Sequence, residues 1–209
     1  MLILHNFYLP PSAKIDVQKI SVQFLTIYLL LPFLVLLPSY RLYFGISVSG
    51  SIRIGNALGA GHAFRADIAA KTTLGMSFVC SSAVAAFLLG FRKQLPRLFT
   101  HDQPIVDLTT KLLCVAAAFQ VGDSVNAGVQ GTFRGSGRQN LGAKLNFIAY
   151  YVLGIPMGAY IAFGLGYGVI GLWMGITISL YFIAFLGSVL VFRSDWRSLV
   201  EEARSRLDE

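Results

Sequence analysis

The sequence predicts an all-α protein, a polytopic membrane bundle of about five transmembrane helices. Hydrophobic residues make up 55% of the 209 residues, charged residues only 13%, and the mean hydropathy is +0.65. This composition is typical of a chain that spans a bilayer. The apolar residues also form long uninterrupted blocks, such as residues 78–91. Such blocks favour helices over the alternating strands of an outer-membrane barrel.

Five segments are long and apolar enough to be transmembrane helices. They cover residues 22–50, 72–91, 108–132, 145–165 and 168–192. Gly135 and Gly137 are expected to end the third span, and Pro156 is placed to kink the fourth. A very short connection joins the fourth span to the fifth.

The distribution of Lys and Arg predicts how these spans are oriented. Ten cations fall on one side of the predicted bundle: Arg53, Arg65, Lys71, Arg134, Arg138, Lys144, Arg193, Arg197, Arg204 and Arg206. Fewer cations fall on the other side, at Lys14, Lys19, Arg92, Lys93, Arg97 and Lys111. The positive-inside rule therefore places the C-terminus in the cytosol. The N-terminus would then lie outside without a cleavable signal, so we expect an upstream segment.

Several function classes are disfavoured. The net charge of +7 does not indicate nucleic-acid binding, because the cations border apolar spans and form no basic domain. Cys80, Cys114 and the histidines lack metal-ligand spacing, so we expect no metal site. No nucleophile elbow, P-loop or dinucleotide fingerprint is present, so we expect no catalytic residues, no cofactor and no enzymatic activity.

Asp123 is the candidate functional residue, because it is the only acidic side chain within the predicted spans. A carboxylate at the centre of a membrane helix costs about 2.5 to 3.5 kcal/mol on insertion scales, so it usually faces a bundle interior or a cavity. Gln120, Asp123 and Gln130 share a helical stripe that Asn126 adjoins. The stripe predicts a cavity wall that binds a proton or a cation. Alternatively, these side chains hydrogen-bond neighbouring helices as structural glue.

Other polar and small residues are expected to have structural roles. We expect the glycine-rich segment of residues 45–71 to be a loop that lets helices approach closely, with Arg53 and Asn56 as polar anchors at the cytosolic end. Arg134 and Arg138 are expected to orient helix ends and bond between helices. Tyr150 and Tyr151 lie one turn inside the fourth span, where an interfacial aromatic belt is favoured over substrate binding.

Three segments, in this order and spacing, resemble the C-terminal part of the multidrug and toxin extrusion (MATE) transporter family. They are SIRIGNALGAG at 51–61, QGTFRGSGRQNLGAKLNFIAYYVLGIP at 130–156 and GVIGLWMGI at 168–176. The resemblance implies two pseudo-symmetric lobes around a central cavity, with this chain supplying the last five of twelve helices. In eukaryotic members an acid often precedes the RGSG turn, where Asp123 stands.

The resemblance divides the chain into three parts and implies a missing one. Residues 1–43, which include part of the first span, depart from the family pattern with Pro32, Pro38 and Arg41. Residues 44–193 resemble most of the C-terminal lobe, and residues 194–209 are expected to be a cytosolic amphipathic tail. The N-terminal lobe and the first helix of the second lobe are absent, so the chain looks like a fragment whose expected partner is that lobe.

The resemblance also implies a function, for which alternatives remain. The leading hypothesis is an antiporter that exports organic cations or xenobiotics in exchange for H⁺, with Na⁺ as the other possible coupling ion, in the plasma membrane or the vacuolar membrane. A lipid-linked flippase is disfavoured, because the spans hold one acid and no Lys or Arg suited to a cationic cavity. Outside transport, the chain would be a truncated protein that scaffolds or modulates a full-length partner in the lipid bilayer.

Overall fold

The computed structural model describes residues 39–98 and 102–205, and these are helical apart from short connections. Residues 39–59 form the first described helix. The other elements are α3 (Ala63–Phe91), α4 (Gln94–Arg97), α5 (Gln103–Gly135), α6 (Gln139–Phe147), η1 (Ile148–Gly154), α7 (Ile155–Ala159), η2 (Tyr160–Gly164), α8 (Val169–Phe192) and α9 (Trp196–Ser205). No strand occurs in this part of the chain.

Four stretches of the described chain are long and apolar enough to cross a membrane. They are Ala63–Phe91, Thr109–Gly135, Gln139–Gly164 and Ile170–Phe192. They match the last four predicted spans, whereas the span predicted at residues 22–50 lies mostly outside the described residues. Large apolar side chains such as Phe163 (81% exposed) and Phe185 (72% exposed) stand on the outer surface, as expected for helices that face lipid. The predicted all-α membrane helical bundle is confirmed.

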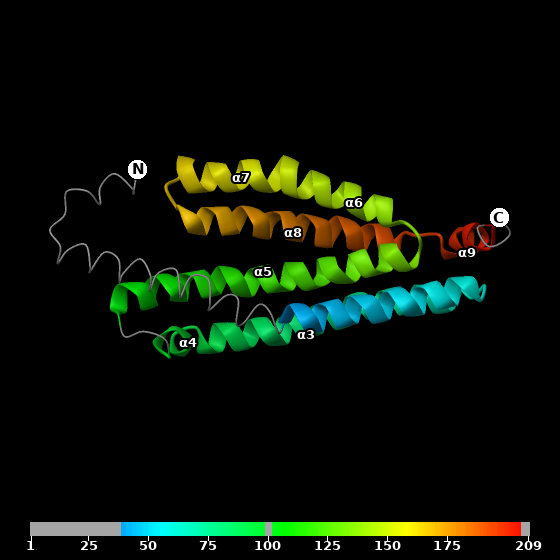
Figure 1. The fold of residues 1–209 in the computed structure, drawn as a ribbon, viewed down its shortest axis with the longest axis horizontal. Helices are drawn as coiled ribbons and strands as arrows, with labels where there is room; N and C mark the ends of the chain where they lie inside the picture. The colour runs from blue at the N-terminus through cyan, green and yellow to red at the C-terminus, as the bar shows by residue number, and fades with distance from the viewer. Residues whose placement is uncertain (1–38, 99–101, 206–209) are drawn as a thin grey trace, which may run out of the picture.

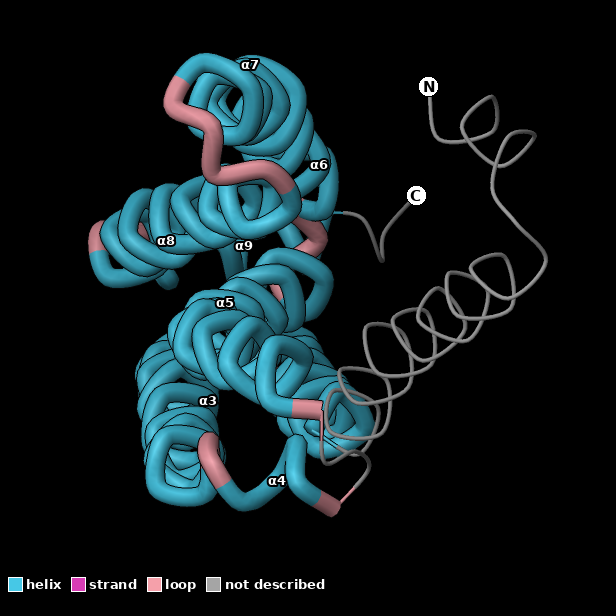
Figure 2. Tube along the Cα trace, turned by 90° about the vertical axis from the view of Figure 1, so that its left-hand side faces the viewer, coloured by secondary structure: helices cyan, strands magenta, loops and turns pink. Residues whose placement is uncertain are grey.

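The helices run side by side, with α5 in the middle (Figure 1). On one side α5 packs against α3, and on the other it packs against α8, beyond which lie α6, η1, α7 and η2 (Figure 2). One end of the bundle gathers the turn after residue 59, the turn after α5, and α9. The cation-rich segments that the structure describes therefore share one end, as the charge pattern predicted.

The prediction of a loop at residues 45–71 is wrong. Apart from the turn at residues 60–62, these residues lie in helix 39–59 and in α3. The turn is a Schellman cap: Gly61 has a φ of +78°, and the His62 N–H donates to the Ala57 carbonyl at 2.8 Å. Gly137 (φ +73°) ends α5 in the same way. Both turns lie at the cation-rich end.

These helices were predicted as a loop because glycine disfavours helix formation in water. In a bilayer, glycine instead permits close packing of helices. With 29 residues, α3 is about 44 Å long, which exceeds the hydrocarbon thickness of about 30 Å. Its first turns therefore extend beyond the hydrocarbon. The exposed ion pair between Lys71 Nζ and Asp67 Oδ2, 2.7 Å apart, lies in this extension.

Glycines bring the helix backbones into contact at two places. On α5, a side chain at Gly131 would collide with the Ser47 carbonyl, and one at Gly135 would collide with the Ser51 carbonyl. The second place joins the fourth predicted span to α8: a Cβ at Gly175 would collide with the backbone of Gly158, whereas a Cβ at Gly158 would make ordinary van der Waals contact with Gly175. The spacing of Gly171 and Gly175 is the GxxxG pattern of membrane helix pairs.

Residues 139–164 form one long helix that is widened at two places into the π-helical turns η1 and η2. Pro156 stands at the start of α7, directly after η1. Because proline has no N–H, the carbonyl of Val152 loses its α-helical partner. The widened turn before Pro156 accommodates this loss, so the expected irregularity at Pro156 takes the form of a π-helical segment.

The tail folds back onto the bundle as α9. Its apolar residues Trp196, Leu199 and Val200 are buried in the main hydrophobic cluster with Ala66 and Ala70 of α3. The apolar face of this amphipathic tail is therefore covered by protein. As a result, the largest core of the described chain lies at the cation-rich end.

The glycine contact between α7 and α8 predicts opposite effects for two similar substitutions. Gly175→Ala places a methyl group against the Gly158 backbone, so we expect it to lower the free energy of unfolding by about 1 to 3 kcal/mol. Gly75→Ala meets no atom within 4 Å and replaces glycine in a helix, so it should leave stability unchanged or raise it by up to about 1 kcal/mol. Denaturant titration in mixed micelles measures both, and equal effects would contradict the packing described.

Candidate functional site

Asp123 lies partly buried in the middle of α5. Tyr43 of helix 39–59 and Tyr150 of η1 lie near enough to Asp123 to interact with it electrostatically. Within residues 39–98 and 102–205, no side chain forms a hydrogen bond or an ion pair with its carboxylate. Among the described residues, Asp123 is therefore an acid without a charged or hydrogen-bonded side-chain partner.

One turn further along α5, three amide side chains form a hydrogen-bonded cluster. Gln130 Nε2 donates to Asn126 Oδ1 at 3.3 Å and to Asn146 Oδ1 of α6 at 3.2 Å. Gly142 lies against Gln130, so a larger residue there would displace the amide. Asn146 and Tyr150 are one helical turn apart on the same face of their helix, and Tyr150 lies near enough to Asp123 to interact with it electrostatically. The two helices thus share a polar wall, which comprises Asp123, Asn126, Gln130, Asn146 and Tyr150.

Gln120 is not part of this polar wall. Its neighbours at one-turn spacing, Ala117 and Ser124, pack on α3: Ala117 lies in a cluster with Ala85 and Leu88, and Ser124 Oγ donates to the Ser77 carbonyl at 2.9 Å. Gln120 lies on the same face and is only 1% exposed. Its Nε2 has no hydrogen-bond partner in the part of the chain that the structure describes. Gln120 thus lies on the face that packs on α3, and not with Asn126 and Gln130, with which its helical spacing grouped it together with Asp123.

The structure also separates the two neighbouring tyrosines. Tyr151 is 62% exposed and stacks on Phe147, with ring centroids 5.0 Å apart, an arrangement suited to an aromatic belt. Tyr150 is only partly exposed and lies near enough to Asp123 to interact with it electrostatically. Only Tyr150 therefore belongs to the polar wall.

The arginines of the motif segments have different positions. Arg134 Nη2 donates to Ser47 Oγ at 2.8 Å, which ties α5 to helix 39–59. Arg138 Nη1 donates to Ser194 Oγ at 2.9 Å, which ties the turn after α5 to the end of α8. Arg53 and Asn56 instead line an open groove between helix 39–59 and α3. The expected bonding between helices is therefore seen at Arg134 and Arg138.

Two residues of the site were not selected from the sequence. Asn146 carried a usable signal, because it is a polar residue one turn before Tyr150 on an apolar helix. Tyr43 had no such signal in the sequence, because an aromatic residue in an apolar span is expected to pack against its neighbours. Its proximity to Asp123 depends on how the helices associate.

The polar wall can hold a small positive charge. One carboxylate supplies the only formal charge among its residues, and the amides and the phenol supply hydrogen-bond partners without neutralising it. No group of three His, Cys, Asp or Glu residues suited to a metal ion occurs within the described ranges. A proton, or an organic cation beside the carboxylate, matches this arrangement.

The fold and this internal polar wall define an integral, multi-pass membrane protein of the helical-bundle class. The family model MatE matches residues 20–160, so the chain belongs to the MatE family. It is 35% identical to multidrug and toxin extrusion protein 2 of Mus musculus, over 80% of this chain and 29% of that protein. It is 33% identical to Protein DETOXIFICATION 14 of Arabidopsis thaliana, over 80% of this chain and 35% of that protein.

A solved structure has the same fold. The crystal structure of the eukaryotic MATE transporter AtDTX14 superposes with a TM-score of 0.77 at 30% sequence identity, over 99% of this chain and 44% of that chain. The chain thus spans about a third of the length of the curated relatives and under half of the solved transporter.

The amide cluster predicts a measurable coupling between α5 and α6. In a double-mutant cycle of Gln130→Ala and Asn146→Ala, we expect a coupling energy of about 0.6 to 1.7 kcal/mol, the range found for hydrogen bonds between membrane helices. Asn140, exposed at the start of α6, supplies the matched control, and its cycle with Gln130 should show no coupling. Unfolding titrations in mixed micelles give both values, and equal coupling energies would contradict the cluster.

Proposed function

We propose that this chain forms most of one lobe of a secondary antiporter that exports organic cations or xenobiotics in exchange for H⁺. Asp123 binds the proton or the substrate cation, and exchange between the two accompanies alternating access. Asn126, Gln130, Asn146 and Tyr150 line the path beside it. The N-terminal lobe, which the relatives' greater length supports, is the partner of this half.

The observation that carries the proposal is the position of Asp123. An ionisable group inside a membrane helix marks a proton or ion pathway by default. Structural glue requires a partner, and the described residues supply Asp123 with no hydrogen bond, whereas Gln130 has two. The glue interpretation therefore suits Gln130 better than Asp123.

A proton is the coupling ion that this site favours. A lone carboxylate suffices to bind a proton, whereas a hard metal cation gathers several oxygen ligands. The carboxylate of Asp123 is the only one in the polar wall. Sodium remains the second candidate, since amide oxygens of Asn126 and Asn146 lie on the same wall.

The cation-rich end of the bundle lies in the cytosol under this proposal, in the plasma membrane or the vacuolar membrane. The turns at Gly61 and Gly137 and helix α9 lie at that end together with most of the Arg and Lys residues. The positive-inside rule then assigns it to the cytosol.

Removing the carboxylate at residue 123 should abolish proton-driven transport by the complete transporter. In proteoliposomes with an imposed pH gradient, Asp123→Asn should reduce uptake of a fluorescent organic cation per molecule by at least about a hundredfold, because the isosteric amide cannot exchange a proton. Asp107→Asn is the matched control, since Asp107 is an exposed acid on the same helix, outside the membrane span.

Each alternative predicts a different result in this assay. If Asp123→Asn transports as well as Asp107→Asn, the proposed role of Asp123 is wrong. If a Na⁺ gradient but not a pH gradient drives the wild-type protein, the coupling ion is sodium. If the wild type transports nothing under either gradient, the scaffold or modulator hypothesis takes precedence.

The proposed partner lobe also predicts the size of the native protein. An antibody raised against residues 194–209 should detect a band at about twice 22.8 kDa in native membranes, because the chain covers 44% of the AtDTX14 chain. A pre-immune serum is the control. A single band near 22.8 kDa would contradict the proposal and would favour a short protein that assembles with a separate partner.

A further inference from the structure

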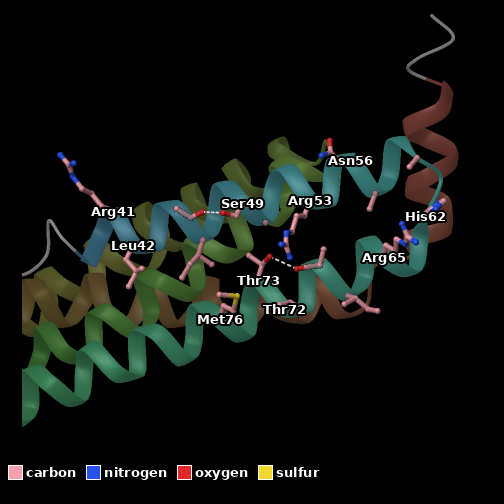
Figure 3. A pocket seen from close by; sticks show the side chains of 17 residues that line it. Arg41, Leu42, Ser49, Arg53, Asn56, His62, Arg65, Thr72, Thr73 and Met76 are labelled. Carbon is pink, nitrogen blue, oxygen red and sulfur yellow. Dashed lines mark hydrogen bonds between the residues drawn. The ribbon is translucent and has the colours of Figure 1, made fainter.

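An open groove runs between helix 39–59 and α3 (Figure 3). Its volume is about 880 Å³. It begins at the turn of residues 60–62, at the cation-rich end, and continues along both helices past Thr73 and Met76. The polar wall around Asp123 is formed by other helix faces, so the groove is a separate feature.

The end of the groove near the turn is positively charged. Arg53, His62 and Arg65 line it, and their side chains are exposed. In Figure 3, the Arg53 guanidinium projects between the two helices, and Arg65 and His62 lie beside one another at the turn. None of the described residues that line the groove is acidic, and the nearby Asp67 forms an ion pair with Lys71. This end therefore favours an anion.

The rest of the groove is mainly apolar. Leu42, Ile46, Ile68 and Met76 line its length, with small residues and hydroxyl groups between them. Arg53 and Leu42 are eleven residues apart on one helix, which corresponds to about 16 Å. This distance equals about half of the 30 Å hydrocarbon core, the depth of one leaflet. An anionic head at Arg53 and a single acyl chain along the groove would match both the charge and the length.

We propose that this groove binds an anionic glycerophospholipid of the leaflet at the cation-rich end. Its phosphate diester accepts hydrogen bonds from the guanidinium groups of Arg53 and Arg65, with His62 beside them. One acyl chain packs against Leu42, Ile46 and Met76. Basic pockets between membrane helices bind lipid head groups by this chemistry, and the apolar length of the groove favours a lipid over free phosphate.

Native mass spectrometry of the protein released from nanodiscs tests this site. The nanodiscs contain equal amounts of phosphatidylglycerol and phosphatidylcholine, which differ in net charge. We expect the wild-type protein to retain phosphatidylglycerol preferentially. Arg53→Gln and Arg65→Gln should each lower that preference about fivefold, the change that corresponds to about 1 kcal/mol per cation near an anionic lipid.

A matched control removes the same charge elsewhere. Arg97→Gln combined with Arg193→Gln neutralises two exposed arginines that do not line the groove: Arg97 is in α4, and Arg193 directly follows α8. The lipid preference of this variant should remain. The variant Arg53→Lys with Arg65→Lys keeps the charge, so it should retain most of the preference and remains informative if a glutamine variant does not fold.

Three results would overturn the proposal. The first is a wild-type protein without preference for phosphatidylglycerol. The second is an equal loss of preference in the groove variants and in the control. The third is displacement of the lipid by excess inorganic phosphate, which would show that the cationic end binds phosphate alone and that the apolar groove contributes nothing.

Discussion

Close approach of helix backbones at glycine is the constraint on which the rest of this bundle depends. Lipid is as apolar as leucine, so no hydrophobic force drives helices together within the bilayer, and packing at short distance must hold them. On α5, Gly131 and Gly135 rest against the backbone of Ser47 and Ser51. The bond from Arg134 to Ser47 spans the same contact. The position of helix 39–59, and with it Tyr43, follows from these two glycines.

Different faces of the central helix α5 have different neighbours: some pack on other helices, and one carries the polar side chains. Ser124 and Gly128 pack on α3, and Gly122 packs on Leu180 of α8. Asn126 and Gln130 instead point toward α6 and meet Asn146. A helix fixed on two sides holds its remaining face at a defined angle, so Asp123 is held in place although no described side chain bonds to its carboxylate. Under the proposed function, this arrangement positions the acid in the bundle and leaves it available to a ligand.

Much of the fold could be predicted from the sequence, because membrane insertion depends on composition and length. The last four predicted spans coincide with helices, and Gly137 does end α5. Residues 45–71 were mistaken for a loop, since glycine signals a turn in water and a contact in lipid. Gln120 was grouped with Asp123 by helical spacing, but its neighbours Ala117 and Ser124 pack on α3. Helical spacing defines a broad stripe, and only the neighbouring helices decide where one face ends. Asn146 and Tyr43 joined the site through tertiary packing, which no local pattern specifies.

Asp123 is the only charged residue of the polar wall, and this affects how the proposed exchange would be coupled. A carboxylate held against a cationic partner would already be neutral as a pair, and a substrate cation would have to displace that partner. No cationic side chain of the described residues forms an ion pair with Asp123. Under the proposed function, its charge is cancelled by whichever cation enters, proton or substrate, and the two exclude each other. Under the proposed function, competition for one carboxylate is sufficient to couple the two fluxes, and the second lobe is needed to alternate access rather than to supply another charge.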